Sequence, residues 1–279
     1  MSLKFCVLAS GSAGNASFLQ AGDFGVLIDI GLGPRQISQR LASAGVNWNA
    51  VKAVLLTHTH ADHWNVRTLG HLKRHRIPIY CHAEHVQWLS AVASYAAMQQ
   101  QGLIRTYRAH EELVLVAGVV CRPLPLRHDG GATFGFRFEC AGDLFGRAGA
   151  LGYVADLGCW DDALVAHLAD VEALALEFNH DVELQHRSGR HPQLIQRVLG
   201  DEGHLSNVQA VALLQAILLR SQPGRLRHLI QLHLSRDCNR PDLAARLAQD
   251  ALGHGVQVHT ARQDRPGPVL HLGSSNGCA

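Results

Sequence analysis

Four side chains that can bind metal occupy six consecutive positions, in the run His58-Thr59-His60-Ala61-Asp62-His63. The run follows the short apolar segment 54–56, so we expect a strand that ends in a ligand-bearing loop. Such a loop can aim imidazole and carboxylate groups at one point, and this mixture of ligands suits a divalent ion such as Zn²⁺. Four ligands so close would crowd one tetrahedral ion, which indicates two ions. The alternative is a polar loop in a chain that carries 19 His.

Short apolar runs alternate with longer helical patterns along the chain, which favours a layered α/β fold. Strands are expected at 4–9, 17–20, 26–29, 53–56, 77–81, 119–122, 134–138, 151–155, 173–176, 229–232 and 256–259. Helices are expected at 34–44, 66–75, 83–100, 163–169, 192–199, 208–220 and 242–251. Ser206 and Gln209 form a capping-box pattern, which places His204 just ahead of a helix.

The composition favours one large domain over residues 1–279, since 47% of the residues are hydrophobic. The end of the chain from about residue 264 is rich in Gly, Pro and Ser, and we expect it to be mobile. The seven Cys include no C-x-x-C pair and are expected to be buried reduced thiols. No signal peptide or membrane-length apolar window is present, so a cytoplasmic protein with no membrane contact is expected.

The formal net charge is only +2, which predicts no strong basic field to attract nucleic acid. A nucleic-acid substrate would therefore have to be held locally. The basic residues are nearly all Arg, whose guanidinium group can pair with a phosphate through two hydrogen bonds. This preference slightly favours a phosphate-containing substrate.

The metal-binding run resembles the HxHxDH signature of the metallo-β-lactamase superfamily. The segments 5–15 (FCVLASGSAGN), 176–181 (LEFNHD), 203–207 (GHLSN) and 232–235 (LHLS) are similar to those of its YycJ/WalJ-type hydrolases. The resemblance covers residues from about 3 to 250. It implies an αββα sandwich, in which two facing mixed β-sheets are flanked by helices and the metal site lies at one edge of both sheets.

The resemblance also implies a complete ligand set for two divalent ions, Zn²⁺ or Mn²⁺ with Fe²⁺ also compatible. One ion would be held by His58, His60 and His128, the other by Asp62, His63 and His233, with Asp156 joining the two. His128, Asp156 and His233 each follow an expected strand. Any one of them alone could equally be a structural group with satisfied hydrogen bonds.

A pair of ions implies hydrolysis, because water that bridges two divalent cations becomes a hydroxide near neutral pH. The leaving group would still need an acid. Ribonuclease Z of the same superfamily has similar motifs, which makes Glu177 and His204 the candidates for a proton-transfer pair, and Asp62 is placed with them among the catalytic residues. The alternative is that Glu177 binds backbone and His204 only precedes a helix cap.

The expected substrate-binding residues lie on one stretch of chain: Asn179, His180, Arg187 and Arg190, with Arg197 as a further phosphate contact. A solvated charged loop is the alternative for the Arg residues. Asn179 and His180 could instead support a metal ligand. Trp64, where relatives usually have a small residue, is expected to reshape the entrance of the site.

The resemblance implies a DNA nuclease of the 5′-to-3′ exonuclease type. A small-molecule hydrolase, acting on a thioester, a lactone or a cyclic phosphodiester, is the second hypothesis, because the same metal core can serve each of these reactions. A non-catalytic metal-binding regulator is the third. The sequence does not indicate an oligomeric state.

Overall fold

The computed structural model describes residues 2–140 and 149–273, and its strands form two sheets of seven. The first sheet has, in spatial order, β14 (Leu270–Leu272), β1 (Leu3–Ala9), β2 (Ala16–Ala21), β3 (Phe24–Ile28), β4 (Val51–Leu55), β5 (Ile79–His82) and β6 (Ile104–Tyr107). The second has β13 (Gln257–Thr260), β12 (His228–Leu232), β11 (Ala173–Glu177), β10 (Ala150–Val154), β9 (Thr133–Cys140), β8 (Val119–Leu126) and β7 (Leu113–Val116).

Each sheet is mixed. Strands β3 to β6 are parallel and β14 to β3 antiparallel, while β10 to β13 are parallel and β7 to β10 antiparallel. Within the second sheet β8, β10, β11 and β12 therefore all run in the same direction. Because their carboxyl ends meet at one edge of the sheet, polar residues that follow these strands are brought together there.

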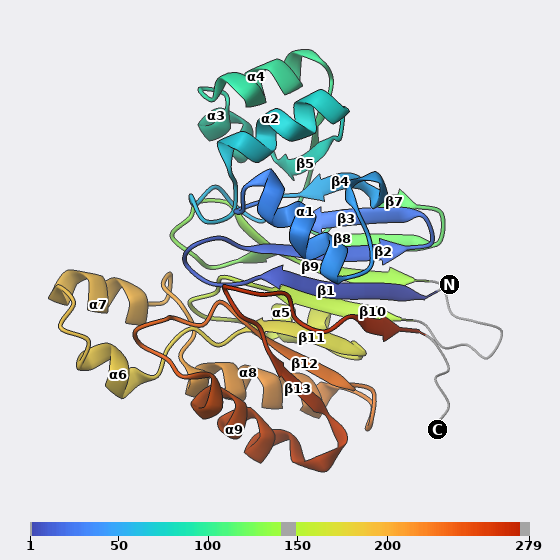
Figure 1. Cartoon of the computed structure of the whole chain (residues 1–279). Coiled ribbons are helices and arrows are strands. Elements are labelled where there is room, and N and C mark those ends of the chain that lie inside the picture. The colour runs from blue at the N-terminus through green and yellow to red at the C-terminus, as the bar shows by residue number, and fades with distance from the viewer. Residues whose placement is uncertain (1, 141–148, 274–279) are drawn as a thin grey trace.

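Apolar side chains fill three layers of core. The inward faces of both sheets share one cluster, which includes Phe5, Phe136 and Phe138. The outer face of the first sheet is covered by α1 (Pro34–Ser43), α2 (Val66–His75), α3 (Ala83–Leu89) and α4 (Ala93–Gln100). The outer face of the second sheet is covered by α5 (Asp162–Leu168), α8 (Asn207–Arg220) and α9 (Pro241–Leu252). Figure 1 shows α2, α3 and α4 on one side of the strands and α8 and α9 on the other, which confirms the expected αββα sandwich.

The main departures from the expected elements lie at the sheet edges and in one helix. The helix expected at 83–100 is two helices, α3 and α4, which are separated by residues 90–92. The edge strands β6, β7 and β14 and the short helix α6 (Val182–His186) were not expected, whereas α2 and α7 (Pro192–Leu199) have the predicted bounds. The segment expected to be mobile from about residue 264 contains β14, which pairs with β1. Its last residues, 274–279, lie outside the described residues.

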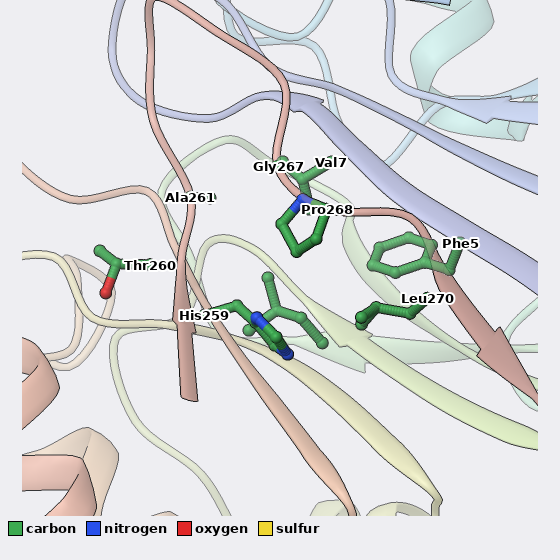
Figure 2. A pocket seen from close by; sticks show the side chains of 9 residues that line it. Phe5, Val7, His259, Thr260, Ala261, Gly267, Pro268 and Leu270 are labelled. Atoms are coloured by element: carbon green, nitrogen blue, oxygen red, sulfur yellow. The ribbon is translucent and has the colours of Figure 1, made fainter. Parts of the chain in front are cut away.

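A small apolar pocket lies where β1, β13 and the segment before β14 meet, beneath Pro268 (Figure 2). Its volume of about 10 Å³ leaves room for no more than about one water molecule, so it is part of the core packing. Among the described cysteines, Cys6, Cys81, Cys121 and Cys238 are buried free thiols, and Cys159 is a partly exposed one. Among the described residues, no helix has the length and apolar character needed to cross a membrane.

Candidate metal centre

The seven side chains predicted as metal ligands converge at the carboxyl ends of the parallel strands. The 58–63 run follows β4, His128 follows β8, Asp156 follows β10 and His233 follows β12. Three groups have all their ligand atoms within 4.8 Å of one another: His58 with His60 and His128, Asp62 with His63 and His233, and His58 with His63 and Asp156. Asp156 is therefore grouped with one member of each of the first two groups, His58 and His63, where a bridging carboxylate would be required.

Hydrogen bonds to one ring nitrogen orient the imidazoles. His63 Nδ1 lies 2.7 Å from Asp29 Oδ2, and His128 Nδ1 lies 2.8 Å from the carbonyl oxygen of Gly203. His58 Nδ1 lies 3.0 Å from Thr57 Oγ1. When Nδ1 carries the proton, Nε2 presents its lone pair, so these contacts select the tautomer that can bind a metal.

Two buried polar atoms of the candidate ligands have no hydrogen-bond partner and are suited to bind a cation. Within the part of the chain that the structure describes, His58 Nε2 and Asp156 Oδ2 are buried without a hydrogen-bond partner, although Asp156 Oδ2 is 3.2 Å from His63 Nε2. Burial holds the pKa of His58 well below its usual value, so this imidazole is neutral and can act as a ligand. Buried polar atoms without partners are costly, and a divalent ion would satisfy both.

The buried carboxylates also require positive charge. Burial raises the pKa of Asp156, but His233 and His63 outweigh it and leave that pKa well below the usual value. Burial lowers the pKa of His63, yet Asp29 and Asp156 raise it to about 10. An anionic Asp156 in this position is what a pair of metal ions would need.

The glycine-containing turn at 11–15 supports the 58–63 run. Asn15 Nδ2 donates to Asp62 Oδ2 at 3.1 Å, and the Asn15 amide donates to the Asp62 carbonyl oxygen at 2.7 Å. A Cβ on Gly31 would lie 1.8 Å from that same carbonyl oxygen, so only Gly allows this approach. Asn15, Gly31 and Asp29 were not predicted as site residues, because single Asn, Gly and Asp residues in turns and after strands carry no distinctive signal.

Glu177 and His204 form the predicted pair. Glu177 is fully buried, and its Oε1 accepts a hydrogen bond from His204 Nδ1 at 2.8 Å. Its Oε2 accepts from the backbone amides of Leu157 and Leu205, each at 3.0 Å. Burial raises the pKa of Glu177, but the charge and hydrogen bond of His204 hold it below the usual value. The two alternatives from the sequence therefore coexist, with one oxygen bound to backbone and the other to the imidazole.

Asn179 and His180, which were expected to contact substrate, are both buried. Asn179 Nδ2 donates to the His233 carbonyl oxygen at 2.9 Å and lies 3.2 Å from His233 Nδ1, so it supports a candidate ligand. Burial lowers the pKa of His180 to about 4, and its ring is closed off from solvent. These positions favour a supporting role over direct contact with a substrate.

The three arginines expected to grip phosphate are each paired with a carboxylate. Arg187 lies 3.7 Å from Glu183, and Arg190 lies 2.9 Å from Asp237. Arg197 binds Asp129 through two nitrogens, and Asp129 itself lies 3.7 Å from His60 Nε2. A phosphate would have to compete with these internal partners, which weakens the case for a clamp at this position.

Trp64, expected to reshape the entrance, is half-buried and packs against the core beneath the helices of the first sheet. Its Nε1 donates to the carbonyl oxygen of Thr59 at 3.0 Å. The indole therefore stabilises the backbone of the 58–63 run through this hydrogen bond and its packing against the core.

Comparison with known proteins agrees with this geometry. Residues 25–222 match the family model described as "Beta-lactamase superfamily domain". The chain is 28% identical to the Exodeoxyribonuclease YycJ of Bacillus anthracis, covering 98% of this chain and 100% of that protein, and 28% identical to the Exodeoxyribonuclease WalJ of Streptococcus pneumoniae, covering 96% and 98%. The crystal structure of the metallo-β-lactamase fold protein YhfI from Bacillus subtilis superposes with a TM-score of 0.67 at 16% identity, over 97% of this chain and 100% of that one. The chain therefore belongs to the metallo-β-lactamase superfamily and is a metal-dependent hydrolase of that fold.

Proposed function

We propose that this hydrolase is a phosphodiesterase that degrades DNA, as an exonuclease working from the 5′ end. Full-length similarity to two proteins named exodeoxyribonucleases supports the substrate class. Two divalent ions, Zn²⁺ or Mn²⁺, are proposed as cofactors, since the donor set consists of imidazole and carboxylate groups.

The observation that carries the proposal is the Glu177 and His204 pair beside the candidate metal centre. His204 Nδ1 lies 3.6 Å from Asp156 Oδ1, so the imidazole borders the proposed bridging carboxylate. An alkoxide is a poor leaving group and needs a proton, and an imidazole next to the attacking centre can donate it. A site for metal binding alone would not need such a pair.

In this proposal the chain's own residues divide the work. His58, His60 and His128 would hold one ion, Asp62, His63 and His233 would hold the other, and Asp156 would contact both. Two bound divalent ions supply an activated water near neutral pH and neutralise charge on the phosphate. The protein's task is to hold these ligands rigidly and to keep their free ring nitrogens directed inward, which Asp29 and Gly203 do through hydrogen bonds.

His204 donates the proton that the leaving group needs. Glu177 accepts from Nδ1, so Nε2 is the nitrogen that faces away from the pair and exchanges a proton with the leaving oxygen. The backbone amides of Leu157 and Leu205 fix the carboxylate, and the carboxylate in turn fixes the ring. Orientation and proton transfer are therefore supplied by one connected hydrogen-bond network.

The test is hydrolysis by metal-loaded protein of single- and double-stranded DNA labelled at the 5′ or the 3′ end, beside bis-p-nitrophenyl phosphate and a thioester. The proposal predicts early release of the 5′ label in short products, with the 3′ label staying in long products. Thioester turnover without DNA degradation would overturn the nuclease proposal in favour of a small-molecule hydrolase. Inactivity of metal-loaded protein on all substrates would favour a metal-binding regulator.

A further inference from the structure

The net charge of the chain is small, but its basic and acidic residues are unevenly distributed along the sequence. Between residues 30 and 83 there are seven Lys and Arg but only one acidic residue, Asp62, which is a candidate metal ligand. The rest of the chain therefore holds more acidic than basic residues. An expectation based on the net charge alone missed this, because an average over the whole chain cannot show where the charges lie.

Four of these seven basic residues line a surface groove along α2. Arg67, Lys73, Arg74 and Arg76 contribute their side chains, and Pro34 at the start of α1 forms part of the opposite wall. Across residues 2–140 and 149–273, none of these four cations has a carboxylate within ion-pair distance. They differ in this respect from Arg187, Arg190 and Arg197, whose charges are already neutralised. Unpaired cations that share one groove form a binding surface for an extended anion.

Arg76 occupies a backbone position that normally favours glycine. It caps the end of α2 with a φ of 55°, in the left-handed region. Basic residues in the last turn also complement the helix dipole, which is the alternative explanation for Lys73 and Arg74. That effect does not account for Arg67 in the first turn, nor for a charged side chain where glycine would be less strained.

Two elements that border the groove begin next to the candidate metal centre. Helix α2 begins three residues after His63, with Asn65 as its N-cap, and the loop before Pro34 contains Gly31, which contacts the Asp62 carbonyl oxygen. Ten helical residues span about 15 Å, which corresponds to roughly four nucleotide steps along a duplex. Figure 1 shows α2 on the outer side of the first sheet, above the strands whose loops carry the 58–63 run.

We propose that the α2 groove binds the sugar–phosphate backbone of DNA at a distance from the reacting phosphodiester, as an extended contact for the strand being degraded. This inference rests on the proposed nuclease function and names the surface that holds its substrate. The lining of the groove includes no large apolar side chain, and attachment to a lipid surface would require such side chains to insert. Phosphate contacts from Arg and Lys require no base sequence, which suits an exonuclease.

A triple substitution of the groove, Lys73→Gln, Arg74→Gln and Arg76→Gln, tests the proposal in the metal-loaded protein. The matched control, Arg108→Gln, Arg220→Gln and Arg246→Gln, lowers the net charge equally at exposed, ion-paired positions elsewhere. Each lost contact to a single strand is worth about 0.7 in the log–log salt slope, which is about fivefold in affinity at 0.1 M salt. The groove variant should therefore lose about 10²-fold in kcat/KM on a 20-nucleotide strand, with the salt slope flatter by about two.

Bis-p-nitrophenyl phosphate and a dinucleotide are too short to reach the groove, so their kcat/KM should be the same in the wild type and both triple variants. Equal losses of kcat/KM in the groove and control variants would show that net charge alone causes the effect, which would overturn the proposal. An equal loss on the dinucleotide would show that the substitutions disturb the metal centre. Vesicles of anionic lipid that bind through the groove, with no effect on the 20-nucleotide strand, would make a membrane the partner instead.

Arg76→Gly removes one groove charge without straining the backbone, so a loss of DNA binding can be distinguished from a loss of folding. Glycine suits the positive φ, so the thermal unfolding midpoint should stay equal or rise while kcat/KM on the long strand falls about fivefold. Unchanged turnover of the long strand would remove Arg76 from the proposed contact.

The proposed nuclease function and the groove can fail separately, because DNA binding is also measured in an Asp156→Asn protein by fluorescence anisotropy. DNA that binds through the groove without being cut by the wild type would refute the nuclease activity alone. DNA that is cut with no change in the groove variant would refute the groove alone.

Discussion

Replacing Glu177 by Gln exchanges one carboxylate oxygen for an amide group with little change of shape. His204 Nδ1 and the Leu157 and Leu205 amides donate to that carboxylate, and His233 Nδ1 lies 3.3 Å from its Oε1. Whichever way the Gln side chain is turned, its own NH₂ group must face at least one of these donors. With the amide oxygen toward the backbone, Gln can donate to His204 Nδ1 only when that nitrogen carries no proton, so a doubly protonated imidazole has no acceptor. With the amide oxygen toward His204, the two backbone donors have none.

The loss of rate or stability in Glu177→Gln depends on which donor loses its acceptor. If the amide oxygen faces the backbone amides, His204 loses its acceptor, and the loss of an oriented general acid costs about 10²–10⁴-fold in rate. If the amide oxygen faces His204, the two buried backbone donors of Leu157 and Leu205 are left unpaired, each at a cost of about 1–3 kcal/mol in the free energy of unfolding. His233 Nδ1 also lies 3.3 Å from Glu177 Oε1, so the metal content of each variant has to be matched to that of the wild type.

The assay compares two phosphodiesters with different leaving groups at equal metal content. A p-nitrophenolate leaves with little protonation, so Glu177→Gln and His204→Ala should slow bis-p-nitrophenyl phosphate far less than DNA. The double variant should be no slower on DNA than His204→Ala, since the two residues act as one unit. Glu172→Gln is the matched control. Glu172 is also buried, but it pairs with Arg227 at the opposite end of β11 from Glu177.

Two results would refute this account of the pair. Equal losses on both substrates would show that Glu177 and His204 position the site and do not donate a proton. Loss of metal from His204→Ala would make His204 a ligand, which its place in a group with Asp156, Glu177 and His233 allows geometrically.

Three further predictions follow from other contacts. Asp29→Asn should weaken metal affinity about 10–100-fold, measured by competition with a chelator, because Asp29 orients His63; unaltered affinity would contradict this. Gly31→Ala should lower both the unfolding midpoint and the metal content, since its Cβ would collide with the Asp62 carbonyl oxygen, and a fully loaded, stable variant would show that the loop can move. His85 is buried and its pKa is lowered to about 4, so the unfolded chain binds its proton first as the pH falls below 6.5. Stability should therefore fall between pH 6.5 and 4, by up to about 3 kcal/mol more in the wild type than in His85→Gln, and parallel pH curves in urea unfolding would contradict it.

The ligand-bearing run could be predicted from the sequence because its chemistry is local. Four metal-binding side chains after a short apolar strand leave few other interpretations, and His128, Asp156 and His233 shared the same strand-end context. The orienting contacts of Asp29 and Asn15 could not be predicted, because they depend on the approach of turns that are distant in the sequence. Such partners have no spacing pattern that periodicity could detect.

Two features of the structure could not be read from the sequence, for clear physical reasons. The region from 83 to 100 contains no Gly or Pro, so nothing local signals the break after Leu89, and the packing of the two helices on the sheet decides it. The cations of the 187–197 region looked available in the sequence, but tertiary structure supplies Asp237 and Asp129 as partners. Whether a charged residue is free is a property of the fold and not of the motif that contains it.

The metal content of the wild type and of one variant decides whether the centre holds two ions joined by Asp156. Elemental analysis should find two divalent ions per wild-type chain, and Asp156→Ala should lose metal while keeping its fold by circular dichroism, because Asp156 is grouped with one member of each set of ligands at the edge of the sheets. A wild-type chain that holds one ion at most, or an Asp156→Ala protein that keeps its full metal content, would contradict a centre of two ions joined by Asp156.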